Sequence, residues 1–99
     1  MSFNLSQLNK AFDSRTRLGI MSILAVNEKV DFPGLKEMLE LTDGNLASHI
    51  AALEKLRYIE VTKQFIGKKP NTSYRITGEG RIAFNQHLNA LESLIKKSK

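Results

Sequence analysis

The chain has 99 residues, of which 41% are hydrophobic and 25% charged, a balance typical of one globular domain and not of a disordered segment. It contains no cysteine, which excludes disulfides, thiolate metal sites and thiol redox sensing. No apolar run approaches the roughly 18–20 residues that span a bilayer, and the N-terminus shows no signal-peptide pattern. We therefore expect a cytoplasmic protein with a single domain over residues 1–99.

The net charge of +5 is unevenly distributed. Basic and acidic residues balance over residues 1–41, whereas residues 42–77 carry an excess of three positive charges and residues 78–99 an excess of two. This placement suggests a polyanionic partner such as nucleic acid.

A short helix is predicted over residues 4–12. Leu5, Leu8 and Phe12 recur there at helical spacing, and Asn4 can cap the first turn.

A second helix is predicted over roughly residues 14–26. It is apolar around much of its circumference, as expected for a central buried helix. Its first turn contains Arg15 and Arg17, which could contact a phosphate or form ion pairs. Pairing with Asp13 or Glu37 is the favoured alternative.

A helix-turn-helix is predicted in the middle of the chain. An extended piece at residues 30–32 precedes a helix over residues 33–39, which Pro33 can open. The next helix spans about residues 43–56 and follows after only three residues, so the two helices must cross steeply.

The helix over residues 43–56 has an unusual exposed face. Thr42 and Asp43 are placed to cap it. Its apolar residues recur on one face: Leu46, Ile50, Leu53 and Leu56. The opposite face carries short side chains where a solvated helix normally carries long charged ones: Asn45, Ser48, His49 and Ala52. This pattern favours close contact with a partner.

The hydrophobic period then changes to two, which predicts a hairpin. Alternating runs at residues 59–65 and 73–77 are joined by a turn at residues 67–71, and residues 30–32 could add a third strand. The aromatic side chains fall at inward positions and are predicted to lie in the core: Phe3, Phe12, Phe32, Tyr58, Phe65, Tyr74 and Phe84.

The last predicted helix runs from about residue 78 to residue 96, with Thr77 as its cap. At about 27 Å it is as long as a domain of this size is wide, so one end of its broad apolar stripe is expected to lack a partner in its own chain.

Four stretches resemble small winged helix-turn-helix transcriptional regulators of the ArsR/MarR type. They are the helix opening at residues 13–18, the helix at residues 41–54, the basic hairpin at residues 68–77 and the helix entry at residues 77–81. The resemblance implies a mainly α fold with a small antiparallel β-hairpin, in the order α-α-β-α-α-β-β-α. It also implies a homodimer that binds double-stranded operator DNA and regulates transcription.

On this resemblance, the helix at residues 43–56 would enter the major groove, and the basic wing (residues 63–75) would contact phosphates or the minor groove. The implied DNA-binding residues are Thr42, Asp43, Asn45, Ser48, His49, Lys63, Lys68, Lys69 and Arg75. The last helix and part of the first would form the dimer interface, through Leu5, Leu8, Phe84, Leu88, Leu91, Leu94 and Ile95.

Other interpretations remain open. A winged-helix protein–protein module without DNA binding is the main alternative. His49 could read a base or make binding pH-sensitive. His87 is expected at the surface or an interface; with Glu92 alone beside it, a metal site is disfavoured. No catalytic framework is recognisable, so we expect no enzyme and no cofactor, and the sequence identifies no effector and no membrane partner.

Overall fold

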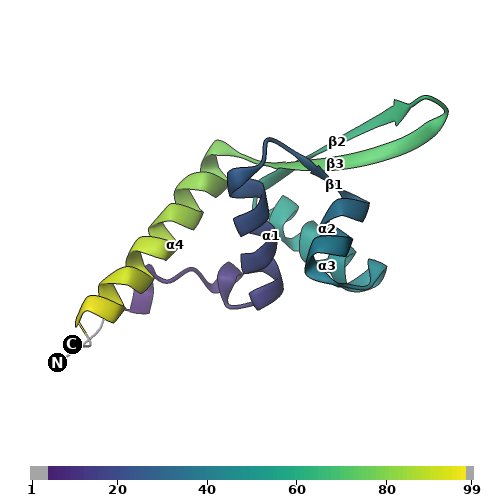
Figure 1. Cartoon of the computed structure of the whole chain (residues 1–99). Helices are drawn as coiled ribbons and strands as arrows, with labels where there is room; N and C mark the ends of the chain where they lie inside the picture. Colours follow the sequence, from purple (N-terminus) through teal and green to yellow (C-terminus); the bar gives the residue numbers. More distant parts are fainter. Residues whose placement is uncertain (1–4, 98–99) are drawn as a thin grey trace.

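The structure is a computed structural model that describes residues 5–97, so the predicted cap Asn4 and the aromatic Phe3 lie outside the described residues. Within this range the chain forms four helices and a three-stranded antiparallel sheet. The elements are α1 (Arg15–Val26), β1 (Val30–Asp31), α2 (Phe32–Leu39), α3 (Asp43–Lys55), β2 (Ile59–Ile66), β3 (Lys69–Ile76) and α4 (Gly78–Lys97). The molecule measures 59 × 25 × 21 Å because the β2–β3 hairpin and α4 extend from opposite ends of a central body (Figure 1).

The helix predicted over residues 4–12 is wrong. Two short 3₁₀ turns, Leu5–Gln7 and Lys10–Phe12, replace it. Asn9 interrupts the helix because its backbone is extended and its side chain accepts the N–H of Ala11 at 2.9 Å. The predicted order of the other elements is confirmed.

The core lies between α1, the helix-turn-helix and the sheet. Ser14 caps α1 by accepting the N–H of Arg17. Fully or almost fully buried side chains come from every layer: Ile20, Met21, Leu24, Leu35, Leu46, Leu53 and Ile59. Each contributes about 1.5–3 kcal/mol on burial, so these contacts dominate the stability of the domain.

The predicted helix-turn-helix is confirmed as α2 and α3. Glu40 ends α2 in the left-handed conformation, and the N–H of Leu41 then donates to the carbonyl of Lys36 at 3.1 Å. Leu41 packs against the core in the angle between the helices, as predicted. Leu56, predicted to extend the buried stripe of α3, is instead 42% exposed because the helix ends one residue earlier.

The sheet has the strand order β1-β3-β2, which confirms the predicted third strand. Val30 pairs with Tyr74 on one side of β3, and Val61 pairs with the same residue on the other. The hairpin turn contains only Gly67 and Lys68, so it is shorter than predicted and the strands are longer. Gly67 has a φ of +65° at the first central position, where a type II′ turn favours glycine.

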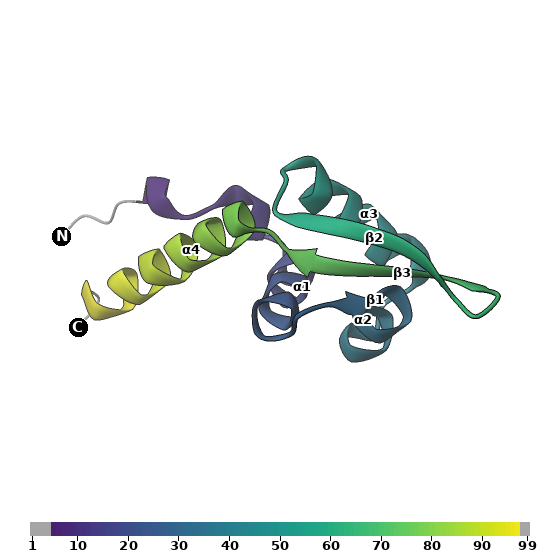
Figure 2. The same cartoon turned by 90° about the horizontal axis from the view of Figure 1, so that it is seen from above.

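Phe65 is not in the core, contrary to the prediction. It continues the inward-facing alternation of β2, but the hairpin at that point has left the body (Figure 2), and the side chain is 72% exposed. The other described aromatic residues are buried or packed against the core.

The start of α4 is fastened to the loop after α3. The hydroxyl of Thr77 donates to the carbonyl of Arg57 at 2.7 Å and accepts the N–H of Gly80 at 2.9 Å, which confirms the predicted cap. The N–H of Thr77 donates to the carbonyl of Tyr58 at 3.0 Å. Gly80 is buried against that carbonyl, and a Cβ at this position would overlap it.

Gly80→Ala should therefore lower the free energy of unfolding by about 1–3 kcal/mol, because the helix start must move away from the backbone of Tyr58. Gly78→Ala is the matched control, since a Cβ there meets nothing within 4 Å. Urea unfolding of both variants checks this expectation, which fails if the two substitutions have equal effects.

Candidate nucleic-acid interface

The exposed face of α3 is built from its cap outward. Thr42 caps the helix as predicted, its hydroxyl accepting the N–H of Asn45 at 3.2 Å. Asn45 and Ser48 are exposed, and Ala52 is half-buried. Because the opposite face of the helix is buried in the core, these short side chains are the ones that face outward.

Arg17 of α1 contacts His49 of α3. Its Nε donates to Nδ1 of the histidine at 3.1 Å, and His49 is half-buried. In a neutral ring that accepts at Nδ1, the proton sits on Nε2, which leaves Nε2–H as a hydrogen-bond donor. The pairing of Arg17 with Asp13 or Glu37, which the sequence favoured, is wrong: none of the ion pairs between described residues joins them.

Two further cations lie beside the N-terminal end of α3. Lys36 Nζ is 2.8 Å from Asp43 Oδ1, and the side chains are 45% and 74% exposed. Arg15 is exposed and lines an open hollow of about 410 Å³ together with Asn45. Sequence reasoning missed Lys36 and favoured an ion pair for Arg15 that is also absent among the described residues, because their proximity to α3 depends on how three helices pack.

The wing (residues 63–75) projects from the body (Figure 1). Lys63, Lys68 and Lys69 are exposed, and none of them forms an ion pair with the described part of the chain. Arg75 differs, because its Nε is 2.8 Å from Glu60 Oε1 across the strand pair. The free positive charge of the wing is therefore concentrated toward its outer end.

Asp31 links the helix-turn-helix to the wing, a role that the sequence did not reveal. Its Oδ1 accepts the N–H of Gly34 at 2.9 Å, which caps α2, and its Oδ2 accepts from Asn71 Nδ2 at 3.3 Å.

At the root of the wing, burial and secondarily the charge of Glu54 raise the pKa of Tyr74. Its phenol therefore stays neutral where it anchors β3 in the core.

The predicted interface residues of the first and last helices occupy different environments. Phe84 is 5% exposed and packs edge-on against Phe12, so its contacts lie within its own chain. Leu8, Leu91 and Leu94 are half-buried. The exposed members are Leu5, Leu88 and Ile95, at 64%, 41% and 65%.

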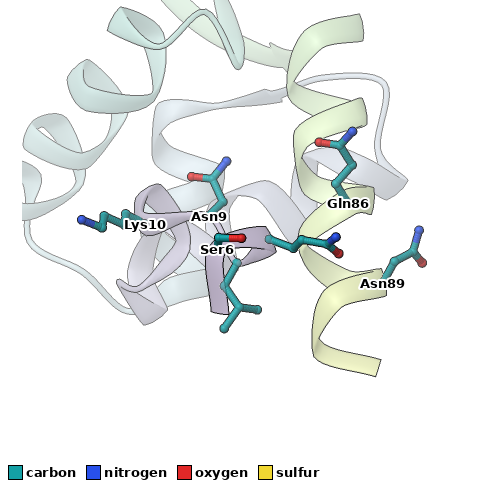
Figure 3. Close-up of a pocket in the computed structure, with 7 residues that line it drawn as sticks. Ser6, Asn9, Lys10, Gln86 and Asn89 are labelled. Carbon is teal, nitrogen blue, oxygen red and sulfur yellow. The ribbon is translucent and has the colours of Figure 1, made fainter. Parts of the chain in front are cut away.

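His87 is buried within its own chain, so its predicted position at the surface or an interface is wrong. It is 5% exposed, its Nδ1 accepts the N–H of Asn9 at 3.0 Å, and its ring lies edge-on to Phe12 at 5.2 Å between centroids. Beside it, residues 6–10 and α4 form the walls of an open pocket of about 670 Å³ (Figure 3). Most of its lining side chains are polar: Ser6, Gln7, Asn9, Lys10, Gln86 and Asn89. Among the described residues, no group of three or more His, Asp or Glu could hold a metal ion.

No helix in the described range is long and apolar enough to cross a membrane.

Comparisons with known proteins find a family model and several similar proteins. A family model described as a winged helix DNA-binding domain matches residues 16–95. An uncharacterised protein of Methanocaldococcus jannaschii is 38% identical over 87 residues, which are 88% of this chain and 95% of that protein. The solved structure of a transcriptional regulator homologue from Pyrococcus horikoshii is 31% identical, with a TM-score of 0.79 over 95% of this chain and 98% of that one.

A third structure, the YusO protein of Bacillus subtilis, gives a TM-score of 0.81 over 95% of this chain and 66% of that one. At 17% identity it supports the fold alone. The predicted fold class and the resemblance to winged helix-turn-helix transcriptional regulators are confirmed. Such regulators are typically not enzymes.

Asp31→Ala should lower the free energy of unfolding by about 1 kcal/mol, because it removes the cap of α2 together with the link to Asn71. Asp31→Asn should cost much less, since asparagine caps helices well. Thermal unfolding followed by circular dichroism distinguishes the variants. An alanine variant as stable as the asparagine variant would contradict the assigned role.

Proposed function

The chain belongs to the winged helix DNA-binding domain family, and from this membership we propose that it is a homodimeric transcriptional regulator that binds double-stranded operator DNA. The proposal includes the cytoplasmic location that the sequence predicts, where a bacterial or archaeal type of regulator would meet its DNA.

One observation carries the proposal: a helix face stripped of long charged side chains lies in the same body as a wing rich in exposed lysines. The face of α3 around Asn45 and Ser48 has room for close approach. The wing contains no aspartate or glutamate at all. This combination suits DNA: its base edges, which differ with the sequence, could contact the exposed face of α3, and its charged phosphates could contact the wing.

In the proposed complex α3 enters the major groove, which admits a helix. Asn45 and Ser48 contact base edges or nearby phosphates. His49 can donate a hydrogen bond from Nε2 to an acceptor on a base or phosphate. Thr42 and Asp43 hold the N-terminal end of the helix near the backbone. Arg15 and Lys36 extend the cationic surface beside that end.

Affinity would come mainly from the wing. Lys63, Lys68 and Lys69 approach phosphates or the minor groove, and the neutralised phosphates release counterions. Arg75 contributes less in this scheme, because Glu60 already neutralises it.

The proposed dimer uses the exposed side of α4. Leu88 and Ile95 are seven residues apart and so lie on one side of the helix, with Leu91 between them. Leu5, Leu8 and Leu94 flank this stripe in the proposal. Since two-fold symmetric proteins read two half-sites, dimerisation would place a second α3 about one helical turn along the DNA.

Replacing two of the three wing lysines, Lys68→Ala with Lys69→Ala, should weaken binding to all duplexes alike. It should also reduce the slope of log affinity against log salt by about 0.9 for each phosphate that the protein no longer neutralises. The measurement is fluorescence anisotropy with labelled duplex over a salt series.

The matched control removes the same charge outside the wing, with Lys10→Ala and Lys96→Ala, and should leave the slope unchanged. Equal slopes for both double variants would contradict the wing assignment. If the wild-type protein shows no retention on heparin or random duplex at low salt, the alternative of a protein–protein module is favoured instead.

Leu88→Asp or Ile95→Asp should convert the dimer to a monomer, because a buried carboxylate without a partner is costly at an interface. Ile82→Asp is the control: this residue is 61% exposed on the same helix but lies on another side of it. Sedimentation velocity at micromolar concentration measures the outcome. A monomeric wild-type protein would contradict the proposed dimer.

A further inference from the structure

The tip of the wing, defined here as residues 65–70, exposes two large apolar side chains. Phe65 is 72% exposed and Ile66 is 62% exposed. Single exposed apolar residues are common on protein surfaces and need no explanation. These two are adjacent, and they sit at the end of a ribbon that projects from the body (Figure 2).

The register places one apolar side chain on each face of the ribbon. Phe65 pairs with Pro70, and Ile66 pairs with Lys69, with the turn Gly67-Lys68 closing the end. Neighbouring residues on a strand point to opposite faces, so neither face of the tip is purely polar. The tip is therefore a narrow apolar wedge with lysines at its end and edge.

The charge around the wedge indicates what kind of partner the tip contacts. Lys63, Lys68 and Lys69 are exposed and without ion pairs to the described residues, and residues 61–78 contain no acidic side chain. A surface that is apolar at its centre and cationic around it fits a partner with a polyanionic backbone and an apolar interior. Double-stranded DNA has both, in its phosphates and its stacked bases.

We propose that Phe65 enters the minor groove and partly unstacks one base step, so that the wing bends the DNA. This inference rests on the proposed DNA-binding function. Proteins that enter the minor groove frequently insert apolar side chains such as Phe, Ile or Pro between base steps, which kinks the duplex by about 20–90° toward the major groove.

The dimensions of the groove support a bend. The minor groove of straight B-DNA is about 6 Å wide. Two strands alone are about 4.8 Å apart, so a two-stranded ribbon with its side chains does not fit without widening the groove. Opening a base step with the ring of Phe65 widens it, and the resulting kink bends the duplex toward the major groove at that step.

Through the wedge, the wing would also contribute to the protein's preference among DNA sequences. Pyrimidine–purine steps are the easiest to kink or unstack, so a site with such a step under the wing costs less to deform. Lysine–phosphate contacts alone carry no such preference.

The test compares Phe65→Ala, Phe65→Trp and the remote control Val26→Ala, whose side chain is 82% exposed on α1. The probe is a short duplex that the wild-type protein selects from a random pool, labelled at both ends for energy transfer. Because Phe65 is exposed, its replacement should not alter thermal unfolding.

Phe65→Ala should bind about tenfold more weakly, with an unchanged salt slope, and should lose the bend. Phe65→Trp and Val26→Ala should bind and bend as the wild type does. An alanine variant that bends the probe like the wild type overturns the wedge while leaving DNA binding intact. A change in sedimentation without a change in the bend also overturns it, since the tip would then contact protein. Absence of duplex selection by the wild type would refute the proposed function itself.

Discussion

The structure depends on the packing of α3 against α1 through side chains that are removed from water. Leu46 and Leu53 are fully buried against the core to which α1 contributes Ile20, Met21 and Leu24. Each such side chain favours the observed packing by about 1.5–3 kcal/mol, and successive helical residues are about 100° apart. Rotating α3 by one position would expose part of this stripe and bury polar groups. The outward direction of the uncharged face therefore follows from the core.

Two polar links then fix the other parts of the molecule to that core. Asp31 caps α2 and holds Asn71 of β3, so the helix-turn-helix and this strand of the wing cannot move independently without losing hydrogen bonds. Thr77 ties the start of α4 to the loop that follows α3. One body thus holds a helix with short exposed side chains, a cationic wing and a long helix that leaves in the opposite direction (Figure 1). This arrangement assigns sequence choice, affinity and dimerisation to three separate elements in the proposed function.

The parts that could be predicted from sequence are those encoded by local periodicity. The burial of Leu46, Ile50 and Leu53 on one face of α3, the presence of two long strands and the caps at Thr42 and Thr77 are properties of short stretches, and the structure confirms them. What could not be predicted depends on the surroundings of a residue. The pattern of β2 continues through Phe65, but whether anything covers that side chain depends on where the body ends. Likewise, His87 is buried because a 3₁₀ segment distant in sequence packs over it, and Arg17 meets His49 rather than a carboxylate because α1 crosses α3.

The central claim is that α3 selects a DNA sequence while a two-fold partner supplies the second half-site. Selection of duplexes by the wild-type protein from a random pool, followed by sequencing, tests it most directly. The account predicts enrichment of two inverted half-sites with centres about one helical turn apart, and an altered preference within each half-site for Asn45→Ala. Recovery of unenriched sequences, or a preference that Asn45→Ala and Ser48→Ala leave unchanged, would contradict it.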